Sequence, residues 1–575
     1  MAEIPQRAQV VVVGGGAIGT ATAYHLNKIG VTDVVLLERK ELTAGTTWHA
    51  AGLITSAGMP TESFLWMSRY TTELLPKLTE ETGQETGFRT IGHLHLGCSP
   101  QRVETITREA IFAKAHGVPV EMVGPEEVRR HWPTIKADDI IAAAWVPDEG
   151  RANPADITQA FAKGARSGGT KIIQGVAVTG FMKANGRVTG VITEQGTIET
   201  ETVVIAAGIW GRQLGELAGV SLPLQAAEHY YLLTDEVEWA DTNAPVVEDP
   251  DRYGYYREEG GGMLVGLFEP EGAPWMLDEI PRDLGFAVLP PDWDRTGGFL
   301  ANALERFPGL DQVGIRQFFC GPESFTADNG PLLGEVPELR GFFSACGLNS
   351  LGILLAGGVG SLMAQWIVDG EPPMDVTGMS VDRMLPFMGN RSFRKERTVE
   401  LLGDLLVDTA SICGEVVTPG TPEALDLLPD QLWALIVFVD ALDRCPWAAF
   451  SGLLGWRVGT YLGLAAAFVR SAYTYALCEA QIVSKTDLSE EEKVFVSMLS
   501  CRDPRPLLSK TEEALIPMLT AMLDRRLPAA SGSGANGPLG RAAAVYCASP
   551  VYKAVADFVR SQADLLRESA ATETE

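Results

Sequence analysis

The N-terminal forty residues carry the pattern that most constrains this chain. Residues 9–13, QVVVV, form an apolar run typical of a fully buried strand, and residues 14–19, GGGAIG, follow at once. An apolar helical pattern then continues through Leu26. A strand, a tight glycine turn and a helix in this order place the unpaired N–H groups of a helix N-terminus where the phosphates of a dinucleotide bind. The sequence therefore predicts an α/β, Rossmann-like domain.

Each glycine of this fingerprint has a separate expected role. Gly14 allows the tight turn, Gly16 lets the backbone approach a pyrophosphate, and Gly19 lets the helix pack closely on the strand. A second buried run, Asp33–Leu37, ends in Glu38, where a carboxylate accepts hydrogen bonds from both ribose hydroxyls. The same carboxylate repels a 2′-phosphate, so the pattern favours FAD or NAD over NADP.

The segment after Glu38 separates FAD from NAD. Residues 36–53, LLERKELTAGTTWHAAGL, resemble the sarcosine dehydrogenase and dimethylglycine dehydrogenase family of amine-oxidising flavoproteins. In that family the histidine of the TTWHAAG motif is bonded to the 8α carbon of the flavin, and the matching residue is His49. The resemblance therefore implies FAD, bound covalently through His49. Small residues on both sides of His49 leave room for a planar ring, whereas the alternative is a buried histidine satisfied by hydrogen bonds.

A rival attachment point is Cys320, just before Gly321-Pro322-Glu323. Related monomeric sarcosine oxidases attach flavin through a cysteine near this place. Because the histidine motif is intact, we expect Cys320 to be an unlinked neighbour of the ring or a small core residue.

Further cofactor contacts are expected from two later segments. A buried strand over Val203–Ala206 leads into Gly208 and Trp210, and glycines at 347, 352, 357, 358 and 360 are predicted to precede an apolar helix. For these later glycines the alternative is ordinary turn chemistry. The full set of expected cofactor-binding residues is Gly14, Gly16, Gly19, Glu38, Arg39, Thr46, Thr47, His49, Gly52, Leu53, Val176, Gly208, Trp210, Gly352 and Ile353.

The resemblance also implies a substrate face. A histidine in the strand EHYYLL and a tyrosine two residues before an arginine line that face in similar sequences, and they match His229, Tyr255 and Arg257. His229 is expected to accept or orient the amine proton, and Tyr255 to hydrogen-bond the substrate carboxylate or shape the pocket. Arg257 is expected either to pair with that carboxylate or to form an exposed structural ion pair.

The implied reaction is oxidative demethylation of a small N-methyl amino acid. Sarcosine is favoured and dimethylglycine comes next, since residues 321–343 resemble the sarcosine dehydrogenase branch more closely. A hydride passes to flavin N5, and water hydrolyses the iminium to release formaldehyde. An electron-transferring flavoprotein or another acceptor is the expected electron partner.

Three other functions stay open at this point. One is a non-catalytic paralogue resembling the regulatory subunit of pyruvate dehydrogenase phosphatase, but that protein lacks the histidine of the WHAAG motif, which is present here as His49. Another is a different FAD-dependent amino-acid oxidase or dehydrogenase. The last is a scaffold whose functional part is the C-terminal region.

At 575 residues the chain is too long for one ordinary core. We expect the Rossmann-like FAD-binding domain to be interleaved with an α+β substrate domain that carries an antiparallel sheet, followed by an all-α C-terminal region. The resemblance stops after residue 403, and the folate-binding domain of the family is not recognisable beyond it, which makes folate use doubtful. The predicted ranges are 1–60, 151–211 and 336–370 for the FAD-binding domain, 61–150 and 212–335 for the substrate domain, 371–403 for a family-specific extension and 404–575 for the helical region.

Composition narrows the partners and the compartment. Forty-six basic residues against 74 acidic ones give a net charge of −28, which disfavours nucleic acid and anionic membrane surfaces. Eight scattered cysteines without a CxxC pair predict reduced thiols and no metal site. The N-terminus shows no targeting segment, so we expect a cytoplasmic protein, or a mitochondrial matrix protein that has lost its presequence. Apolar stretches at 445–456 and 458–469 end at Arg457 and Arg470, too short to span a bilayer.

Overall fold

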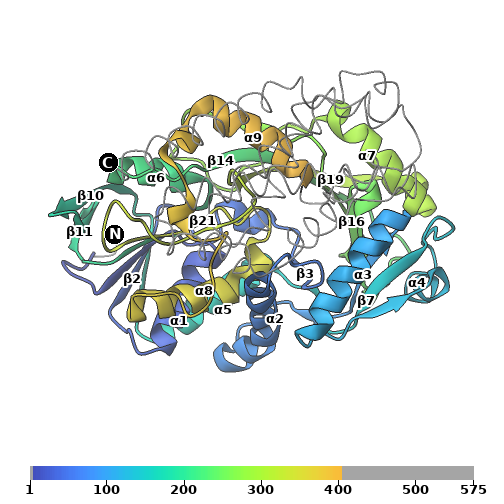
Figure 1. Ribbon diagram of the computed structural model, residues 1–575, viewed down its shortest axis with the longest axis horizontal. Helices are drawn as coiled ribbons and strands as arrows, with labels where there is room; N and C mark the ends of the chain where they lie inside the picture. Colours follow the sequence, from blue (N-terminus) through green and yellow to red (C-terminus); the bar gives the residue numbers. More distant parts are fainter. Residues whose placement is uncertain (1–3, 405–575) are drawn as a thin grey trace, which may run out of the picture. The chain divides into compact units, whose positions relative to one another are not determined.

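A computed structural model describes residues 4–404 (Figure 1). A six-stranded sheet carries the glycine fingerprint. The strand order is β20-β21-β13-β1-β2-β9, and all neighbours are parallel except β20 and β21. The predicted first strand, glycine turn and helix are present. The strands are β1 (Val10–Val13), β2 (Val34–Glu38), β9 (Lys171–Gln174), β13 (Val203–Ile205), β20 (Leu332–Glu335) and β21 (Phe342–Cys346).

Both faces of this sheet are covered, which explains why β1 is apolar throughout. Val10 and Val12 belong to the core beneath the helices, and Val11 and Val13 belong to the core on the opposite face. The helices are α1 (Ala17–Lys28), α2 (Glu62–Thr82), α5 (Pro154–Ser167) and α8 (Gly352–Asp369), which gather together in Figure 1. The opposite face carries the antiparallel strands β10 (Val178–Ala184), β11 (Arg187–Thr193) and β12 (Gly196–Glu199).

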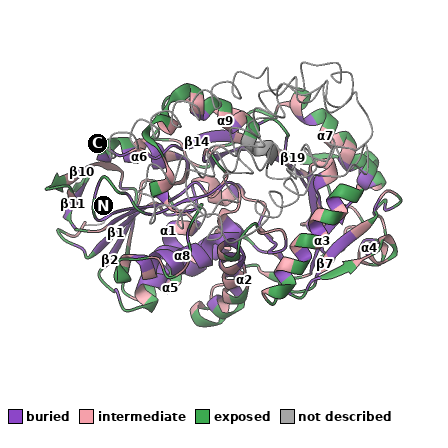
Figure 2. Cartoon of the chain, viewed as in Figure 1, coloured by how far each residue is buried: buried purple, intermediate pink, exposed green. Residues whose placement is uncertain are grey.

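Helix α8 corrects one expectation about glycine. Gly357, Gly358 and Gly360 lie inside the helix and do not precede it. A Cβ on Gly358 would lie 2.3 Å from Met67 Cα of α2, and one on Gly360 would lie 2.7 Å from the Ala21 carbonyl carbon of α1. These glycines therefore allow three helices to approach closely. Helix α8 is long and apolar enough to cross a membrane, but 67% of it is buried inside the fold. In Figure 2 most of this helix has the colour of buried residues.

A second, nine-stranded sheet lies beside the first. Most neighbours are antiparallel, as expected, but β5 and β15 run parallel. The path is β18-β14-β17-β16-β15-β5-β7-β6, and β19 also pairs with β14. The strands are β5 (His93–Gly97), β6 (Glu121–Val123), β7 (Ala142–Val146), β14 (Gln225–Thr234), β15 (Val246–Asp249), β16 (Gly254–Glu259), β17 (Gly262–Leu267), β18 (Ala273–Trp275) and β19 (Ile315–Phe325).

Smaller elements complete the described part. A three-stranded sheet joins β3 (Leu53–Ile54), β8 (Gly150–Arg151) and β4 (Arg89–Thr90). The other helices are α3 (Pro100–Ala115), α4 (Pro125–His131), α6 (Gly211–Ala218), α7 (Trp293–Arg306) and α9 (Arg391–Asp404), with 3₁₀ turns η1 (Thr46–His49), η2 (Gly208–Trp210), η3 (Pro250–Arg252), η4 (Pro308–Gln312), η5 (Val381–Arg383) and η6 (Pro386–Gly389).

The two large sheets draw their strands from alternating parts of the chain. Strand β20, at Leu332–Glu335, already belongs to the six-stranded sheet, four residues before the predicted domain boundary at 336. Helix α2, assigned to the substrate domain, packs in the core of the six-stranded sheet through Met67 and Leu75. The domain ranges themselves stay a prediction, and the predicted all-α region 404–575 lies outside the described residues except for the end of α9.

Candidate active site

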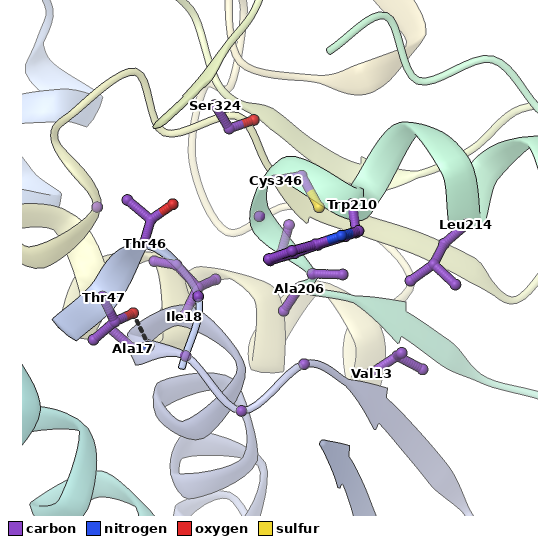
Figure 3. A pocket seen from close by; sticks show the side chains of 18 of the residues that line it. Val13, Ala17, Ile18, Thr46, Thr47, Ala206, Trp210, Leu214, Ser324 and Cys346 are labelled. Carbon is purple, nitrogen blue, oxygen red and sulfur yellow. Dashed lines mark hydrogen bonds between the residues drawn. The ribbon is translucent and has the colours of Figure 1, made fainter. Parts of the chain in front are cut away.

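A pocket opens along the carboxyl ends of β1, β2 and β13 (Figure 3). Figure 3 shows the Trp210 ring and Leu214 on one side and Thr46 and Thr47 on the other. Many of the expected cofactor-binding residues line this pocket: Gly14, Gly16, Glu38, Arg39, Thr46, Thr47, Val176, Gly208, Trp210, Gly352 and Ile353. Gly19, His49, Gly52 and Leu53 do not line it.

The fingerprint glycines divide into two kinds. A Cβ on Gly14 would lie 2.3 Å from the Ala206 carbonyl oxygen, and one on Gly19 would lie 2.0 Å from the Gly14 carbonyl oxygen. These two positions therefore hold strand and helix together. Gly16 is the N-cap of α1, and its nearest obstacle would be Thr47 Oγ1 at 3.0 Å. Backbone open to the pocket at this helix N-terminus fits a pyrophosphate.

The acidic residue at the end of β2 faces the same pocket. Glu38 Oε2 accepts a hydrogen bond from Gly15 N at 2.7 Å, and its Oε1 accepts one from Lys40 N at 2.8 Å. The guanidinium of Arg39 stacks on the Trp210 ring, 3.7 Å from its centroid. Glu38 lies beside the glycine turn, where it fits the ribose of a nucleotide. The planar Arg39–Trp210 pair next to it fits the nucleotide's ring.

Two further segments close the pocket. Ala17 N donates a hydrogen bond to Thr47 Oγ1 at 3.2 Å, and Thr46 Oγ1 donates one to the Pro322 carbonyl at 3.0 Å. Before α8, Asn349 and Ser350 have φ angles of 48° and 69°, in the left-handed region that non-glycine residues rarely adopt. Both line the pocket. In the sequence, only the glycines of this segment indicated a cofactor contact.

His49 lies beside the pocket, pressed against β19. A Cβ on Gly321 would lie 2.3 Å from His49 Cε1, so this glycine makes room for the imidazole. The residue is 5% exposed, and among the described residues its ring has a hydrogen bond only to its own backbone. Burial lowers the pKa of His49, and the opposing influence of Glu323 does not reverse the shift. The imidazole is therefore neutral at neutral pH.

His229 of β14 lies opposite Gly321 in the register of the two strands. It is buried, its ring centroid lies 4.7 Å from that of Phe268, and its Nδ1 lies 3.8 Å from Glu269 Oε2. Burial lowers the pKa of His229, but Glu269 and Glu323 outweigh burial and the net shift is upward.

Neither Glu269 nor Glu323 was predicted from the sequence as a site residue. Glu323 lines the pocket, is 5% exposed and accepts a hydrogen bond from Ser350 Oγ at 2.6 Å. Its only signal was a charge within the apolar segment FFCGPESF, and Glu269 likewise ends an apolar strand run.

The other two expected substrate residues are buried nearby. The Tyr255 ring occupies the space above Gly266, where a Cβ would lie 1.8 Å from it, and burial raises the Tyr255 pKa well above its ordinary value. Arg257 Nε donates to the Ala51 carbonyl at 2.9 Å, and its Nη1 bonds the Glu258 carbonyl and the Glu259 carboxylate. Among the described residues Nη2 has no hydrogen bond. Arg257 forms an ion pair with Glu259, but the guanidinium is buried and not exposed as in the expected structural ion pair, and its Nη2 is left without a bond to the described residues.

Cys320 lies on the other face of β19. Its register partner is Tyr230, whereas His229 and Gly321 pair on the face that His49 contacts. Burial raises the Cys320 pKa to about 12, which leaves a poor nucleophile. This placement agrees with the expectation that Cys320 is a small core residue.

Three expected cofactor residues have packing contacts instead of pocket contacts. A Cβ on Gly19 would collide with the Gly14 carbonyl oxygen, and a Cβ on Gly52 would lie 2.2 Å from the Ala152 carbonyl oxygen. Leu53 pairs with Arg151 in the small sheet and packs beside the Tyr231 and Tyr255 rings. Adjacency to a cofactor motif in sequence did not distinguish contact with the cofactor from support behind it.

The profile of the family described as FAD dependent oxidoreductase (DAO) matches residues 9–366 of this chain. The chain belongs to this family. The match runs from the first strand of the fingerprint through most of α8, so it covers both large sheets and the whole pocket. FAD is therefore the dinucleotide that this fold takes, and the choice of FAD over NAD is confirmed.

Individual relatives of this FAD-dependent oxidoreductase agree with the predicted branch. The chain is 38% identical over 402 residues to 4-methylaminobutanoate oxidase (formaldehyde-forming) of Paenarthrobacter nicotinovorans, covering 70% of this chain and 48% of that one. It is also 38% identical over 386 residues to mitochondrial sarcosine dehydrogenase of Homo sapiens, covering 66% and 42%. The chain thus spans less than half the length of these relatives.

A solved structure supports the fold. L-proline dehydrogenase from P. horikoshii matches with a TM-score of 0.60 and 26% sequence identity, over 66% of this chain and 98% of that one. An almost complete dehydrogenase therefore superposes on about two thirds of the chain, which confirms the mixed α/β fold.

Proposed function

We propose that this chain catalyses FAD-dependent oxidative demethylation of a small N-methyl amino acid, with sarcosine as the favoured substrate and dimethylglycine next. One observation carries the proposal. His229, Glu269, Glu323 and Tyr255 converge on the face of β14 and β19 against which His49 packs. Buried acid–base groups beside a flavin pocket are what deprotonation of an amine requires. The names of both relatives, which describe oxidation of N-methyl amino acids, support the same reaction class.

The proposal includes covalent FAD at His49. The imidazole is buried and its pKa is lowered, and among the described residues its ring has a hydrogen bond only to the backbone of His49 itself, so no neighbouring side chain holds it as a core histidine would be held. Thr46, Thr47 and Ala50, which surround His49 in the chain, all line the pocket. When bound, FAD supplies the two-electron acceptor for the amine.

The chain's own residues then have distinct tasks. His229 accepts the proton of the substrate amine, and Tyr255 shapes the apolar wall together with Phe268. The unoccupied Nη2 edge of Arg257 pairs with the substrate carboxylate, while the bonds to Ala51 and Glu259 hold the guanidinium in place. The proposal also includes release of formaldehyde and a cytoplasmic location. Electrons pass to an electron-transferring flavoprotein or to another acceptor. Folate use is not part of the proposal.

The decisive experiment is anaerobic reduction of the flavin by a panel of amines. Sarcosine and dimethylglycine are expected to bleach the yellow protein faster than proline, glycine betaine or D-amino acids. His229→Gln is expected to keep its flavin but to be reduced by sarcosine ~10²-fold more slowly, the usual effect of losing a positioned acid–base group. His131→Gln, a change on the surface helix α4, serves as the control and keeps the parent rate. If no N-methyl amino acid reduces the flavin of the parent protein, the proposed reaction is wrong.

A further inference from the structure

Glu269 is a buried carboxylate in the loop after β17. Its side chain is 2% exposed, and neither oxygen has a hydrogen-bond partner among the residues that the structure describes. Nδ1 of His229 lies 3.8 Å from Oε2 and is likewise buried without a hydrogen bond. An unpaired buried carboxylate is strongly disfavoured, so Glu269 is expected to gain a partner in the working protein.

The surroundings of His229 determine which ring nitrogen faces the protein and which one can contact a ligand. The Phe268 ring covers one side of the imidazole, and Gly321 opposite it leaves the space that His49 enters. Nδ1 of His229 is buried from solvent and has no hydrogen bond to a described residue, whereas Nε2 is not among the buried atoms that lack one. Nε2 is therefore the nitrogen left to meet a ligand.

We propose that Glu269 is the positioning residue of His229, whose Nδ1–H it holds so that the Nε2 lone pair is directed at the substrate amine. This inference rests on the proposed function, because it takes His229 as the group that receives the proton. The role of one nitrogen is thereby fixed by the hydrogen bond of the other, as in carboxylate–histidine pairs elsewhere.

The proton step is simple and balanced. The substrate amine arrives as an ammonium at neutral pH. Nε2 of His229 accepts its proton, the N–H bond breaks, and the electron pair of that bond stays on the amine nitrogen. The ring becomes an imidazolium, whose charge the Glu269 carboxylate stabilises. The separation of 3.8 Å is expected to contract to a hydrogen bond in the complex, as catalytic contacts commonly do.

Other charged groups also act on the His229 ring, and their effects on its pKa must be distinguished from the effect of Glu269. Glu323 of β19 raises the His229 pKa and Arg295 of α7 lowers it. A charge on His229 in turn lowers the pKa of His49 of η1. Arg295 is bonded to Glu228 and Tyr230. Glu269 is the carboxylate that lies next to Nδ1, so it alone is expected to set the tautomer.

The tautomer is measured directly in the flavin-loaded parent protein. Full-length protein is labelled with ¹⁵N-histidine, and the His229 signals are assigned among the seven histidines by their loss in His229→Gln. The neutral ring is expected to carry its proton on Nδ1. A neutral ring with the proton on Nε2 would overturn the proposal, and this measurement requires no Glu269 variant.

Removing the charge of Glu269 gives the second test. In Glu269→Gln the flavin content is expected to stay constant, the His229 pKa to fall by about one unit, and reduction by sarcosine to slow ~10-fold or more. Because the reaction needs neutral His229, the rate rises with pH, and its midpoint is expected to move to lower pH together with the His229 pKa. Glu269→Asp keeps the charge and is expected to restore most of the pKa.

Glu271→Gln is the matched control, since it removes the same charge two residues away from an exposed side chain. It is expected to leave the His229 pKa and the pH profile unchanged. An unchanged His229 pKa in folded Glu269→Gln would contradict the proposal. A parent protein that no N-methyl amino acid reduces would contradict the proposed function instead, and the tautomer and pKa would still decide the role of Glu269.

Discussion

At the scale of single residues, the proposed attachment of FAD depends on the surroundings of His49. It is buried and neutral, and Gly321 opens the space in front of its ring. Core histidines normally satisfy both ring nitrogens with hydrogen bonds. Among the described residues the His49 ring is bonded only to its own backbone, which supports the proposed bond to the cofactor.

This environment leads to a prediction about attachment. Acid-precipitated parent protein is expected to stay yellow, whereas His49→Ala is expected to release its FAD into the supernatant. Peptide mapping of the parent protein should find the flavin on the peptide that contains His49. Cys320→Ser is the control, and it is expected to keep the bound colour because Cys320 faces Tyr230 on the other side of β19. Equal release of FAD from the parent and from His49→Ala would disprove the covalent bond.

At the scale of elements, a buried ionic cluster fixes the chain just after the TTWHAAG motif. His93 of β5 is fully buried, with Nδ1 2.9 Å from Glu149 Oε2 and Nε2 3.4 Å from Glu248 Oε2 of β15. Glu149 accepts hydrogen bonds from Ser56 N and Ala57 N. One imidazolium therefore ties two strands of the large sheet to the segment that leaves the flavin pocket.

This cluster makes stability depend on pH. Burial lowers the pKa of His93, but Glu248 and Glu149 outweigh burial and raise it to about 10. Because the folded pKa lies above the ordinary value, the stabilisation is complete below pH ~6.5 and is lost as the pH rises toward 10. The difference in free energy of unfolding between the parent and His93→Gln is expected to shrink from pH 7 to pH 9.5 in urea titrations. The corresponding difference for His131→Gln is expected to stay flat, and a flat His93 difference would refute the charged cluster.

The elements also show what sequence can and cannot predict here. The first strand, the glycine turn and Glu38 were predictable because local pattern and backbone geometry determine them. Gly358 was placed wrongly because glycine serves both turns and close helix packing, and only the contact with Met67 distinguishes them. Glu269 and His229 lie forty residues apart in the chain, and their approach depends on how β14 and β17 pair, which no local pattern encodes.

At the scale of the whole molecule, the flavin pocket and the groups to which we assign the chemistry lie within a single compact unit. That unit ends at Ser411, and its last described element, α9, is anchored through Arg394, which bonds Gln225 of β14 and the Leu277 carbonyl. L-proline dehydrogenase from P. horikoshii, matched over 98% of its own length, covers 66% of this chain. All the residues to which we assign cofactor or substrate contacts precede Gly370.

The last prediction follows from this organisation. A protein truncated after Ser411 is expected to bind FAD stoichiometrically and to be reduced by sarcosine at nearly the rate of the full chain, because every residue assigned to the reaction is retained. Truncation after Gly389 is the informative comparison. It removes α9 and the Arg394 bonds to Gln225 and Leu277, and loss of such buried, charge-assisted hydrogen bonds costs about 2–5 kcal/mol, so the shorter protein should melt at a lower temperature. Flavin content, thermal melting and anaerobic reduction are measured on both. If the protein ending at Ser411 folds with full flavin but is not reduced, a group beyond residue 411 takes part in the reaction, and the assignment of the chemistry to His229 and its neighbours is wrong.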